Sequence, residues 1–389
     1  MKIGYFVGKF PYPNYIPDYK YGGGEVVAYE LAVNMAKRGH DVHVFTTSIN
    51  SKETIENRER LNIHRYGTII TLFQRNVSLS LVFKPLKERV DIVHVHVGST
   101  PFELIASLLY AKINKKPLVV TYHGDIIPSY NDFIYQTSVQ VYNMIVKEVL
   151  KYADIIIIPS RYYVSESLFL KDYKDKIVEI PNGINYQNFE VSYSKEECRR
   201  KLGLPIDKKI ILYLGVLHPK KGLDILLKAM PKIVAEIPDS ELVIAGDGIM
   251  RRKLEELSEK LGVKDHVNFA GFVPENLKPL YYNSADIFCL PSRMSTEVFP
   301  VVLLEASASG LPMVVSDLNT LKCIIEHGYN GIITKRGDEN EIAQAIISLL
   351  EDENLRRKMS KNAKRKVKYY HWSKITKKYE DLYYTLINR

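Results

Sequence analysis

Two glutamates, Glu297 and Glu305, flank an apolar block in the stretch STEVFPVVLLEASASGLP. Pro300 suits the first turn of a helix and Gly310 suits its end, so we expect a short helix from about residue 300 to 309. The residues of this helix leave no polar face, which is typical of a buried helix. Because an unpaired buried carboxylate is costly, Glu305 is expected to meet a cation, a set of hydrogen-bond donors or a polar ligand.

Glu297 is expected on the loop before this helix, where unpaired backbone N–H groups attract anions. Two interpretations of the glutamate pair stay open from this stretch alone. One is a polar ligand held by both carboxylates. The other is a charge at a helix start together with one ion pair in the core.

A long loop after the first expected strand ends in Gly22, Gly23 and Gly24, and a helical pattern follows. Glycines at a helix start let backbone N–H groups approach a phosphate closely. The spacing fits neither the dinucleotide-binding fingerprint nor the P-loop, which weakens both of those interpretations. A loop that is merely flexible is the alternative.

In the second half of the chain, LGVLHPKKGLD puts Lys220 and Lys221 between a strand and a helix. A lysine in this place can reach a diphosphate as a mobile point charge, and Lys221, beside the helix start, fits that role better. His123 in TYHGD ends an apolar strand, the usual place for a site residue, although a lone histidine there is more often structural. His94 and His96 alternate with valines and are interpreted as core groups or as supports behind a site.

The composition indicates a soluble globular protein, with 389 residues, 46% of them apolar and 25% charged, which is long enough for two domains. Three scattered cysteines suggest a reducing compartment without disulfides. The chain begins with a strand-like run rather than a signal peptide, and no apolar stretch approaches the roughly 20 residues that span a bilayer. We therefore expect a cytoplasmic protein. No cluster of His, Asp or Glu has metal-ligand spacing, so no metal is expected.

The net charge of +9 is concentrated near the end of the chain, where residues 356–378 hold eleven Lys or Arg and no acid. A solvated helix face is the plainer explanation of this run. An anionic membrane surface is a further candidate partner. Nucleic acid is not expected as a partner, because no recognised binding module accompanies the basic run.

Buried-strand runs alternate with amphipathic segments along most of the chain, which indicates parallel sheets covered on both faces. YADIIIIPS at 152–160 is echoed by SADIFCLPS at 284–292. This echo favours two similar doubly wound α/β domains, 1–190 and 191–389, joined near residues 181–189. In such sheets ligands bind beyond the carboxyl ends of the strands, so two facing domains would form a cleft.

Together these motifs resemble glycosyltransferase family 4, retaining sugar transferases of the GT-B architecture. The resemblance spans nearly the whole chain, through GGGE with ELAVNMAKRGHDV, TYHGD, IPNGI, the KKG loop, LVIAGDG, FAGFV, ADIFCLPS and the E-x₇-E pair. It implies two Rossmann-like domains facing a central cleft, with a final helix, about 372–389, packing back on the first domain. The first domain would bind the acceptor and the second the nucleotide-sugar.

The resemblance also implies roles for particular residues. His123 would hold the sugar ring, Glu297 would contact the transferring sugar, and Lys221 would neutralise the diphosphate; these are the expected catalytic residues. Glu305 would accept hydrogen bonds from the ribose hydroxyls. Donor-binding residues are expected at Gly23, Gly24, Gly215, Lys221, Phe272, Val273, Glu297, Pro300, Val301, Val302 and Glu305. Lysine and helix termini can stabilise the growing charge of the departing diphosphate, so neither metal nor cofactor is expected.

The chain departs from the family pattern at three positions. Val216 follows Gly215 where the family usually has arginine, so one of two diphosphate cations is missing unless His218 or Lys220 replaces it. Pro300 stands where glycine is usual and removes one backbone donor. Asn185 replaces a common aspartate, a change expected to matter less.

The sequence names neither the sugar nor the acceptor. A UDP- or GDP-sugar is favoured over an ADP-sugar as donor, with a glycan, a lipid-linked or a small-molecule acceptor. A tyrosine-rich loop in the first domain could stack on a sugar or lie against lipid headgroups at the inner face of the membrane: Tyr12, Tyr15, Tyr19 and Tyr21. Two alternatives share the architecture, namely a nucleotide-sugar 2-epimerase or hydrolase and a non-catalytic partner subunit that binds the donor.

Overall fold

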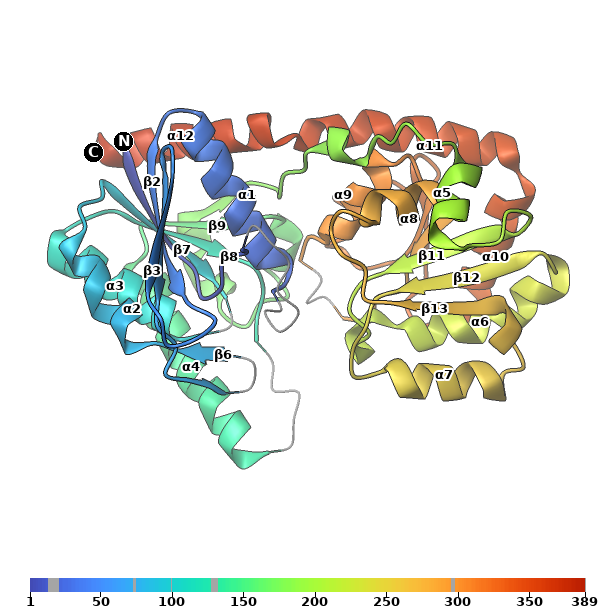
Figure 1. Ribbon diagram of the computed structural model, residues 1–389, viewed down its shortest axis with the longest axis horizontal. Coiled ribbons are helices and arrows are strands. Elements are labelled where there is room, and N and C mark those ends of the chain that lie inside the picture. Colours follow the sequence, from blue (N-terminus) through green and yellow to red (C-terminus); the bar gives the residue numbers. More distant parts are fainter. Residues whose placement is uncertain (13–20, 73–74, 99, 127–131, 295–297, 389) are drawn as a thin grey trace. The chain divides into compact units, whose positions relative to one another are not determined.

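The computed structural model describes residues 1–12, 21–72, 75–98, 100–126, 132–294 and 298–388 (Figure 1). Three residues with an expected role, Tyr15, Tyr19 and Glu297, lie outside these ranges. The chain divides into two units. The first comprises residues 1–183 together with 372–389, and the second comprises 184–371. The division after Gly183 falls somewhat before the expected boundary at residue 190.

The first unit is built on an eight-stranded sheet in the order β10-β9-β8-β7-β1-β2-β4-β3. Its neighbouring strands pair in parallel except for the edge strand β3, which runs antiparallel to β4. The strands are β1 (Lys2–Phe6), β2 (Asp41–Thr47), β3 (Thr54–Arg58), β4 (Leu61–Tyr66), β7 (Ile92–Val97), β8 (Leu118–Tyr122), β9 (Ile155–Ile158) and β10 (Ile177–Glu179). A separate hairpin is formed by β5 (Ile70–Leu72) and β6 (Arg75–Val77).

Helices of the first unit connect these strands in the right order for a doubly wound sheet. They are α1 (Gly23–Lys37), α2 (Leu79–Phe83), α3 (Phe102–Asn114), α4 (Phe133–Tyr152) and α12 (Trp372–Ile387). The sheet order reverses between β1 and β7, which is the place where ligands bind in open α/β sheets. The end of β1, the start of α1 and the end of β7 therefore lie at this point of reversal.

The C-terminal helix α12 packs within the first unit. The Glu380 carboxylate pairs with the Arg38 guanidinium and accepts a hydrogen bond from His40 Nε2 at 2.8 Å, just after the end of α1. The hydroxyl of Tyr383 contacts the hydroxyl of Tyr5 at 3.1 Å, which ties the helix to the first strand. The chain passes from one unit to the other after Gly183 and returns at Trp372. A Cβ added to Gly183 would lie 2.4 Å from the ring of Trp372, so these two segments pack against each other.

The second unit has a six-stranded, wholly parallel sheet in the order β13-β12-β11-β14-β15-β16. Its strands are β11 (Lys209–Leu214), β12 (Ser240–Ala245), β13 (Val267–Gly271), β14 (Ile287–Leu290), β15 (Met313–Ser316) and β16 (Gly331–Thr334). The helices are α5 (Lys195–Leu202), α6 (Leu223–Glu236), α7 (Arg251–Lys260), α8 (Lys278–Ser284), α9 (Val301–Ala308), α10 (Glu339–Glu351) and α11 (Glu353–Val367). In chain order this is the 3-2-1-4-5-6 arrangement of a Rossmann fold, which reverses between β11 and β14.

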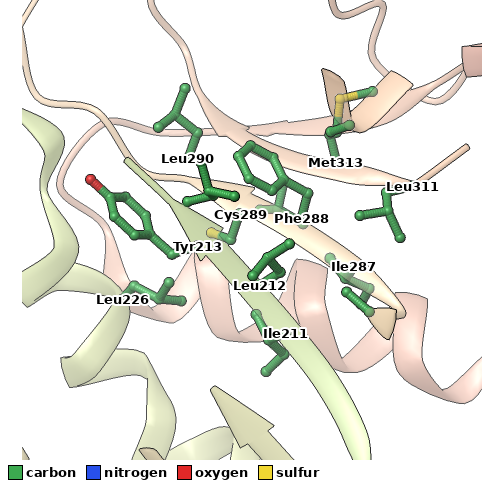
Figure 2. Close-up of a cluster of buried hydrophobic side chains, with 14 of the residues drawn as sticks. Ile211, Leu212, Tyr213, Leu226, Ile287, Phe288, Cys289, Leu290, Leu311 and Met313 are labelled. Carbon is green, nitrogen blue, oxygen red and sulfur yellow. The ribbon is translucent and has the colours of Figure 1, made fainter. Parts of the chain in front are cut away.

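The strands of the second unit are continuous apolar runs in the sequence because both of their faces are buried in its core. Figure 2 shows consecutive residues of β11 and β14, such as Ile211, Leu212 and Phe288, packed among Leu226 of α6 and Met313 of β15. Each of these side chains is fully buried. A parallel sheet covered on both faces buries successive residues alike, so the alternation typical of a half-exposed strand is absent from these segments.

The expected helix near residue 300 is present as α9, with a small difference at its start. Pro300 has an extended ψ of 115° and precedes the first helical residue, Val301, rather than forming part of the first turn. The helix ends before Gly310, whose φ is +75°. A Cβ at Gly310 would lie 2.5 Å from Lys364 Cε, because α11 packs closely there.

Candidate active site

In the second unit, glycines allow two loops at the carboxyl ends of the strands to approach each other. Gly215 follows β11 with a φ of +155°, and Gly246 follows β12 with a φ of +153°. A Cβ added to Gly246 would lie 1.9 Å from the carbonyl oxygen of Gly215. Only glycine therefore fits at residue 246. The contact also holds the backbone of Gly215 at the carboxyl edge of the sheet, where the nucleotide-sugar is expected to bind.

The loop that carries Lys221 is fixed by backbone contacts on both sides. The N–H of Lys221 donates to the carbonyl of His218 at 2.9 Å, and Gly222 adopts a left-handed φ of +67°. A Cβ at Gly222 would lie 2.0 Å from the carbonyl oxygen of Pro291. The loop thus rests on the segment that follows β14. Lys220 and Lys221 are both partly buried, so exposure does not distinguish them.

Arg293 is a further cation beside this loop, and no sequence motif marked it. The N–H of Arg293 donates to the carbonyl of Lys220 at 2.8 Å, and its guanidinium pairs with Asp224 at the start of α6. Val216, where the family usually has arginine, is 61% exposed. Its carbonyl accepts a hydrogen bond from the Tyr213 hydroxyl at 3.0 Å. No local sequence signal marks Arg293, because its place depends on the fold bringing the segments after β11 and β14 together.

Glu305 is buried on α9 and has both a cation and a hydrogen-bond donor. The Tyr282 hydroxyl donates to Oε2 of Glu305 at 2.7 Å, and Lys278 Nζ lies 3.6 Å from Oε1. Lys278 also pairs with Glu275 at 2.7 Å. A carboxylate can accept about four hydrogen bonds, so these partners leave room for further donors.

Burial raises the pKa of Glu305, and the nearby Lys278 charge opposes that rise. Burial also disfavours the charged form of Lys278, but the carboxylates of Glu305 and Glu275 outweigh it and raise the pKa of the lysine. The sequence-based expectation of a cation and donors around Glu305 is thus met. Both interpretations of Glu305, a core ion pair and a group that binds a ligand, are compatible with this geometry.

The remaining donor-binding candidates of the second unit surround the same edge of the sheet. Phe272 and Val273 follow β13; Phe272 is 58% exposed and Val273 is buried. Val301 and Val302 open α9 and are partly buried behind Pro300. The first N–H groups of a helix lack partners within the helix, so this turn presents donors to an anion or a hydroxyl.

In the first unit, Gly24 lies against the ring of His123. A Cβ added to Gly24 would lie 3.2 Å from both Cδ2 and Cγ of that imidazole. A Cβ added to Gly23 would have no atom within 4 Å. The start of α1 is also capped, because the N–H of Gly22 donates to the Glu25 carboxylate at 3.0 Å. Absence of a side chain at residue 24 therefore lets the helix start approach His123 closely.

His123 is hydrogen-bonded to another histidine. Its Nε2 lies 2.9 Å from Nδ1 of His96, which is buried in β7. Burial lowers the pKa of His123 to about 4 and the pKa of His96 well below its ordinary value. Both rings are therefore neutral at pH 7. The sequence had indicated His96 as a core group or a support behind a site, and the parallel pairing of β7 with β8 places it beside His123.

Two family models match most of the chain. Residues 21–188 match the one described as Glycosyltransferase Family 4, and residues 194–366 match the one described as Glycosyl transferases group 1. An uncharacterised glycosyltransferase of Methanocaldococcus jannaschii is 31% identical, over 98% of this chain and 98% of its own length. The chain belongs to glycosyltransferase family 4. The expected family and enzyme class are thereby confirmed, and the protein is a glycosyltransferase.

Other similar proteins agree with this assignment. A phosphatidyl-myo-inositol mannosyltransferase of Mycolicibacterium smegmatis is 30% identical over 76% of this chain and 71% of its own length. Among solved structures, sucrose-phosphate synthase from Thermosynechococcus elongatus has a TM-score of 0.80 at 22% identity, with 100% and 99% of the two chains covered. Anabaena HepE in complex with UDP and glucose has a TM-score of 0.77 at 20% identity, with 99% and 100% covered. The GT-B fold with two Rossmann-like units is confirmed.

Two tyrosines of the expected acceptor loop can be placed in this glycosyltransferase. The Tyr12 hydroxyl accepts a hydrogen bond from the N–H of Ile49 at 3.2 Å, and the Arg65 guanidinium lies 3.6 Å above its ring. Tyr12 is thus held by the first unit itself. Tyr21 is 36% exposed just before α1.

Within the described residues, one group of side chains has the composition of a metal site: His43 on β2, His64 on β4 and Glu88 before β7. Nδ1 of His43 lies 3.2 Å from Nε2 of His64, with the ring planes 20° apart. Nearly coplanar rings at this distance hydrogen-bond directly to each other, whereas metal ligands aim their lone pairs at a common centre. None of the segments that carry the expected sugar-nucleotide contacts contributes to this group.

Proposed function

We propose that the protein transfers a sugar from a nucleoside-diphosphate sugar to a glycan, lipid or small-molecule acceptor, with retention of the anomeric configuration. The observation that carries this proposal is the buried Glu305 carboxylate behind the opening turn of α9. It lies on the segment after β14, next to the strand that leads to Lys221. In a Rossmann-like sheet, the reversal between β11 and β14 is where a nucleotide is expected.

The chemistry required at this place is stabilisation of growing negative charge. As the glycosidic bond to the diphosphate breaks, the sugar becomes oxocarbenium-like and the leaving phosphate gains charge. In the proposed arrangement Lys221 and the first amides of α9 face that charge, while Glu305 holds the ribose. The leaving phosphate accepts the proton of the incoming hydroxyl, so the mechanism needs neither an enzymic nucleophile nor a metal.

His123 and the start of α1 are proposed to hold the sugar. A neutral imidazole offers one N–H donor and one acceptor, which suits a sugar hydroxyl. Because Gly24 lies against the ring, the N–H groups at the start of α1 come close to whatever His123 binds.

The acceptor and the place of action are also proposals. Similar proteins include the mannosyltransferase named for phosphatidyl-myo-inositol and an N-acetyl-alpha-D-glucosaminyl L-malate synthase of Bacillus anthracis, which is 28% identical over 94% of this chain and 94% of its own length. We propose a cytoplasmic enzyme that meets a lipid-linked acceptor at the membrane face. No described helix is long and apolar enough to cross a bilayer. The exposed basic residues of α11 would attract anionic lipid.

A donor panel with product analysis tests the proposed function. UDP-, GDP- and ADP-sugars are incubated with and without candidate acceptors, and the nucleotide and sugar products are identified by mass spectrometry. Release of nucleotide that depends on an acceptor supports transfer. Formation of an epimer or free sugar without an acceptor supports the epimerase or hydrolase alternative, and binding without turnover supports a partner subunit.

A further inference from the structure

Three histidines lie together in the first unit at the ends of two neighbouring strands. His94 and His96 alternate along β7, and His123 follows β8, whose register pairs His96 with Thr121. The rings of His94 and His96 stack with centroids 4.6 Å apart. The rings of His96 and His123 are 5.2 Å apart with planes at 20°. Such nearly coplanar rings, with nitrogens 2.9 Å apart, form a direct hydrogen bond from one imidazole to the other.

This bond contains one proton, and its position fixes the tautomers of both rings. Each neutral imidazole has a single N–H, on either Nδ1 or Nε2. If His96 is protonated on Nδ1, it donates to Nε2 of His123. If instead His123 donates from Nε2, then His96 is protonated on its own Nε2.

The surroundings of His96 distinguish the two arrangements. Nε2 of His96 is buried and has no hydrogen-bond partner among the described residues. A proton there would be an unsatisfied buried N–H, whereas a bare nitrogen there is an acceptor that goes unused. Orphaned buried N–H groups are the rarer of the two in folded proteins. The favoured arrangement therefore has His96 donating from Nδ1, which leaves the single proton of His123 on Nδ1.

This tautomer determines what the other nitrogen of His123, Nδ1, can offer to a ligand. Its Nδ1 makes no hydrogen bond with the described residues, and it is 3.6 Å from the position of a Cβ on Gly24. We propose that His96 is a positioning residue, which sets the tautomer of His123 so that this ring presents an N–H donor from Nδ1 to an oxygen of the transferring sugar. This inference rests on the proposed role of His123 in sugar binding.

The C-terminal helix α12 helps to fix the ring of His94, on which the ring of His96 stacks. His94 Nε2 is hydrogen-bonded to the Thr121 hydroxyl at 2.7 Å, and its Nδ1 to the hydroxyl of Tyr383 on α12. Both nitrogens of His94 are thus occupied, which fixes the ring on which His96 stacks. The orientation of His96 is in turn limited by this stacking and by its bond to His123.

Two variants of nearly equal size separate the tautomer from mere packing. In His96→Asn, the amide N–H can occupy the place of Nδ1–H and still donate to His123. In His96→Asp, the ionised carboxylate can only accept, so His123 then places a proton on Nε2. Val95→Ala, a buried change on the opposite face of the same strand, serves as the control for lost stability.

The direct readout is the ¹⁵N NMR spectrum of the imidazole nitrogens in the full chain, with His123 assigned by its loss in His123→Gln. At pH 7 we expect His123 to be protonated on Nδ1 in the native protein and in His96→Asn. In His96→Asp the proton should be on Nε2. A native His123 protonated on Nε2 would overturn the tautomer assignment, whatever the enzyme's substrate.

The second readout is kcat with the donor that the panel identifies. We expect His96→Asn to stay within about 3-fold of the native enzyme, and His96→Asp to lose about 10-fold or more, with Val95→Ala near native. Equal losses in the Asn and Asp variants would reduce His96 to a packing residue. The predicted change of tautomer without any change in kcat would overturn the role of His123 in transfer, and the proposal with it.

Discussion

The hydroxyl of Tyr282 donates a 2.7 Å hydrogen bond to Glu305, whose other oxygen lies 3.6 Å from the Lys278 ammonium. The carboxylate is therefore partnered before any ligand arrives. Fixed partners on one side hold a carboxylate in a defined orientation, which favours recognition of a pair of hydroxyls on the other. The same partners make Glu305 part of the core, so its two roles must be separated by experiment.

Lys221 should be more important for turnover than its neighbour. Lys221→Ala is expected to lower kcat by about 10² or more, because the ammonium is proposed to face charge that grows in the transition state. Lys220→Ala is the matched control and should have a much smaller effect. Steady-state kinetics with one donor measures both variants, and equal effects would count against the assignment.

Activity should survive removal of divalent metal. The proposed neutralising groups are an ammonium and helix amides, and no carboxylate cluster in the sequence has the spacing to hold Mg²⁺ or Mn²⁺ at the diphosphate. Turnover is compared before and after dialysis against EDTA. Complete loss that added Mg²⁺ or Mn²⁺ restores would contradict the metal-free mechanism.

Substitution of Gly24 should impair the reaction without unfolding the protein. Alanine is the better helix former by about 1 kcal/mol, but its Cβ at residue 24 would lie 3.2 Å from the His123 ring and push it aside. Gly23→Ala adds a Cβ that meets nothing within 4 Å and controls for helix propensity. We expect both melting temperatures to be native or higher, with the larger loss of kcat in Gly24→Ala. A fully active Gly24→Ala variant would show that the close approach to His123 is unimportant.

Glu103 should make the first unit less stable as pH rises. Burial raises the pKa of this carboxyl to about 8, against about 4.5 in the unfolded chain, although backbone N–H donors oppose the shift. The native state therefore binds the proton more tightly, so stability is full below pH 4.5 and is lost progressively up to about pH 8. Urea unfolding at pH 5, 7 and 9 should show this decline.

Glu103→Gln provides the control for that pH dependence. An amide resembles the protonated carboxyl in size and does not titrate, so the variant should lose stability less steeply between pH 5 and 9. The Glu103 side chain packs tightly against the backbone of Gly8, where a Cβ would lie only 3.0 Å from Oε1. A side chain larger than glutamine at residue 103 would therefore not fit, and glutamine is the replacement of choice. Parallel declines in the native and variant proteins would assign the effect to another group.

Apolar runs predicted most of the buried parallel strands, although not β4, β10 or β16, and the predictions failed at the edge of the first unit. The strands of the second unit from β11 to β15 were expected, because covered parallel strands are continuous apolar runs. The edge strand β3 and the hairpin of β5 and β6 were not, since segments such as TIENR are short, mixed in polarity and largely exposed. Their pairing is decided by the fold rather than by local pattern.

The candidate site shows the same division. Lys221, Glu305 and His123 were marked by motif and by position at strand ends. His96 was marked only as a core group or a support behind a site, and Tyr282 was not marked at all, because a contact between distant segments leaves no trace in local spacing. Glu297, the other member of the glutamate pair, lies outside the described residues, so its role in sugar binding stays a prediction.

Nucleotide binding by Glu305→Gln is the most direct test of donor recognition by the second unit. The substitution keeps the shape of the side chain but removes its charge, and Lys278 keeps its pairing with Glu275 at 2.7 Å. Calorimetric titration with the nucleotide identified by the donor panel, alongside thermal unfolding of the free protein, measures the two roles separately. We predict that binding weakens by about 1–3 kcal/mol, the usual scale for a charged hydrogen-bonding partner, while the melting temperature falls only modestly. Native affinity in a sharply destabilised variant would contradict the account and leave Glu305 as an ion pair of the core.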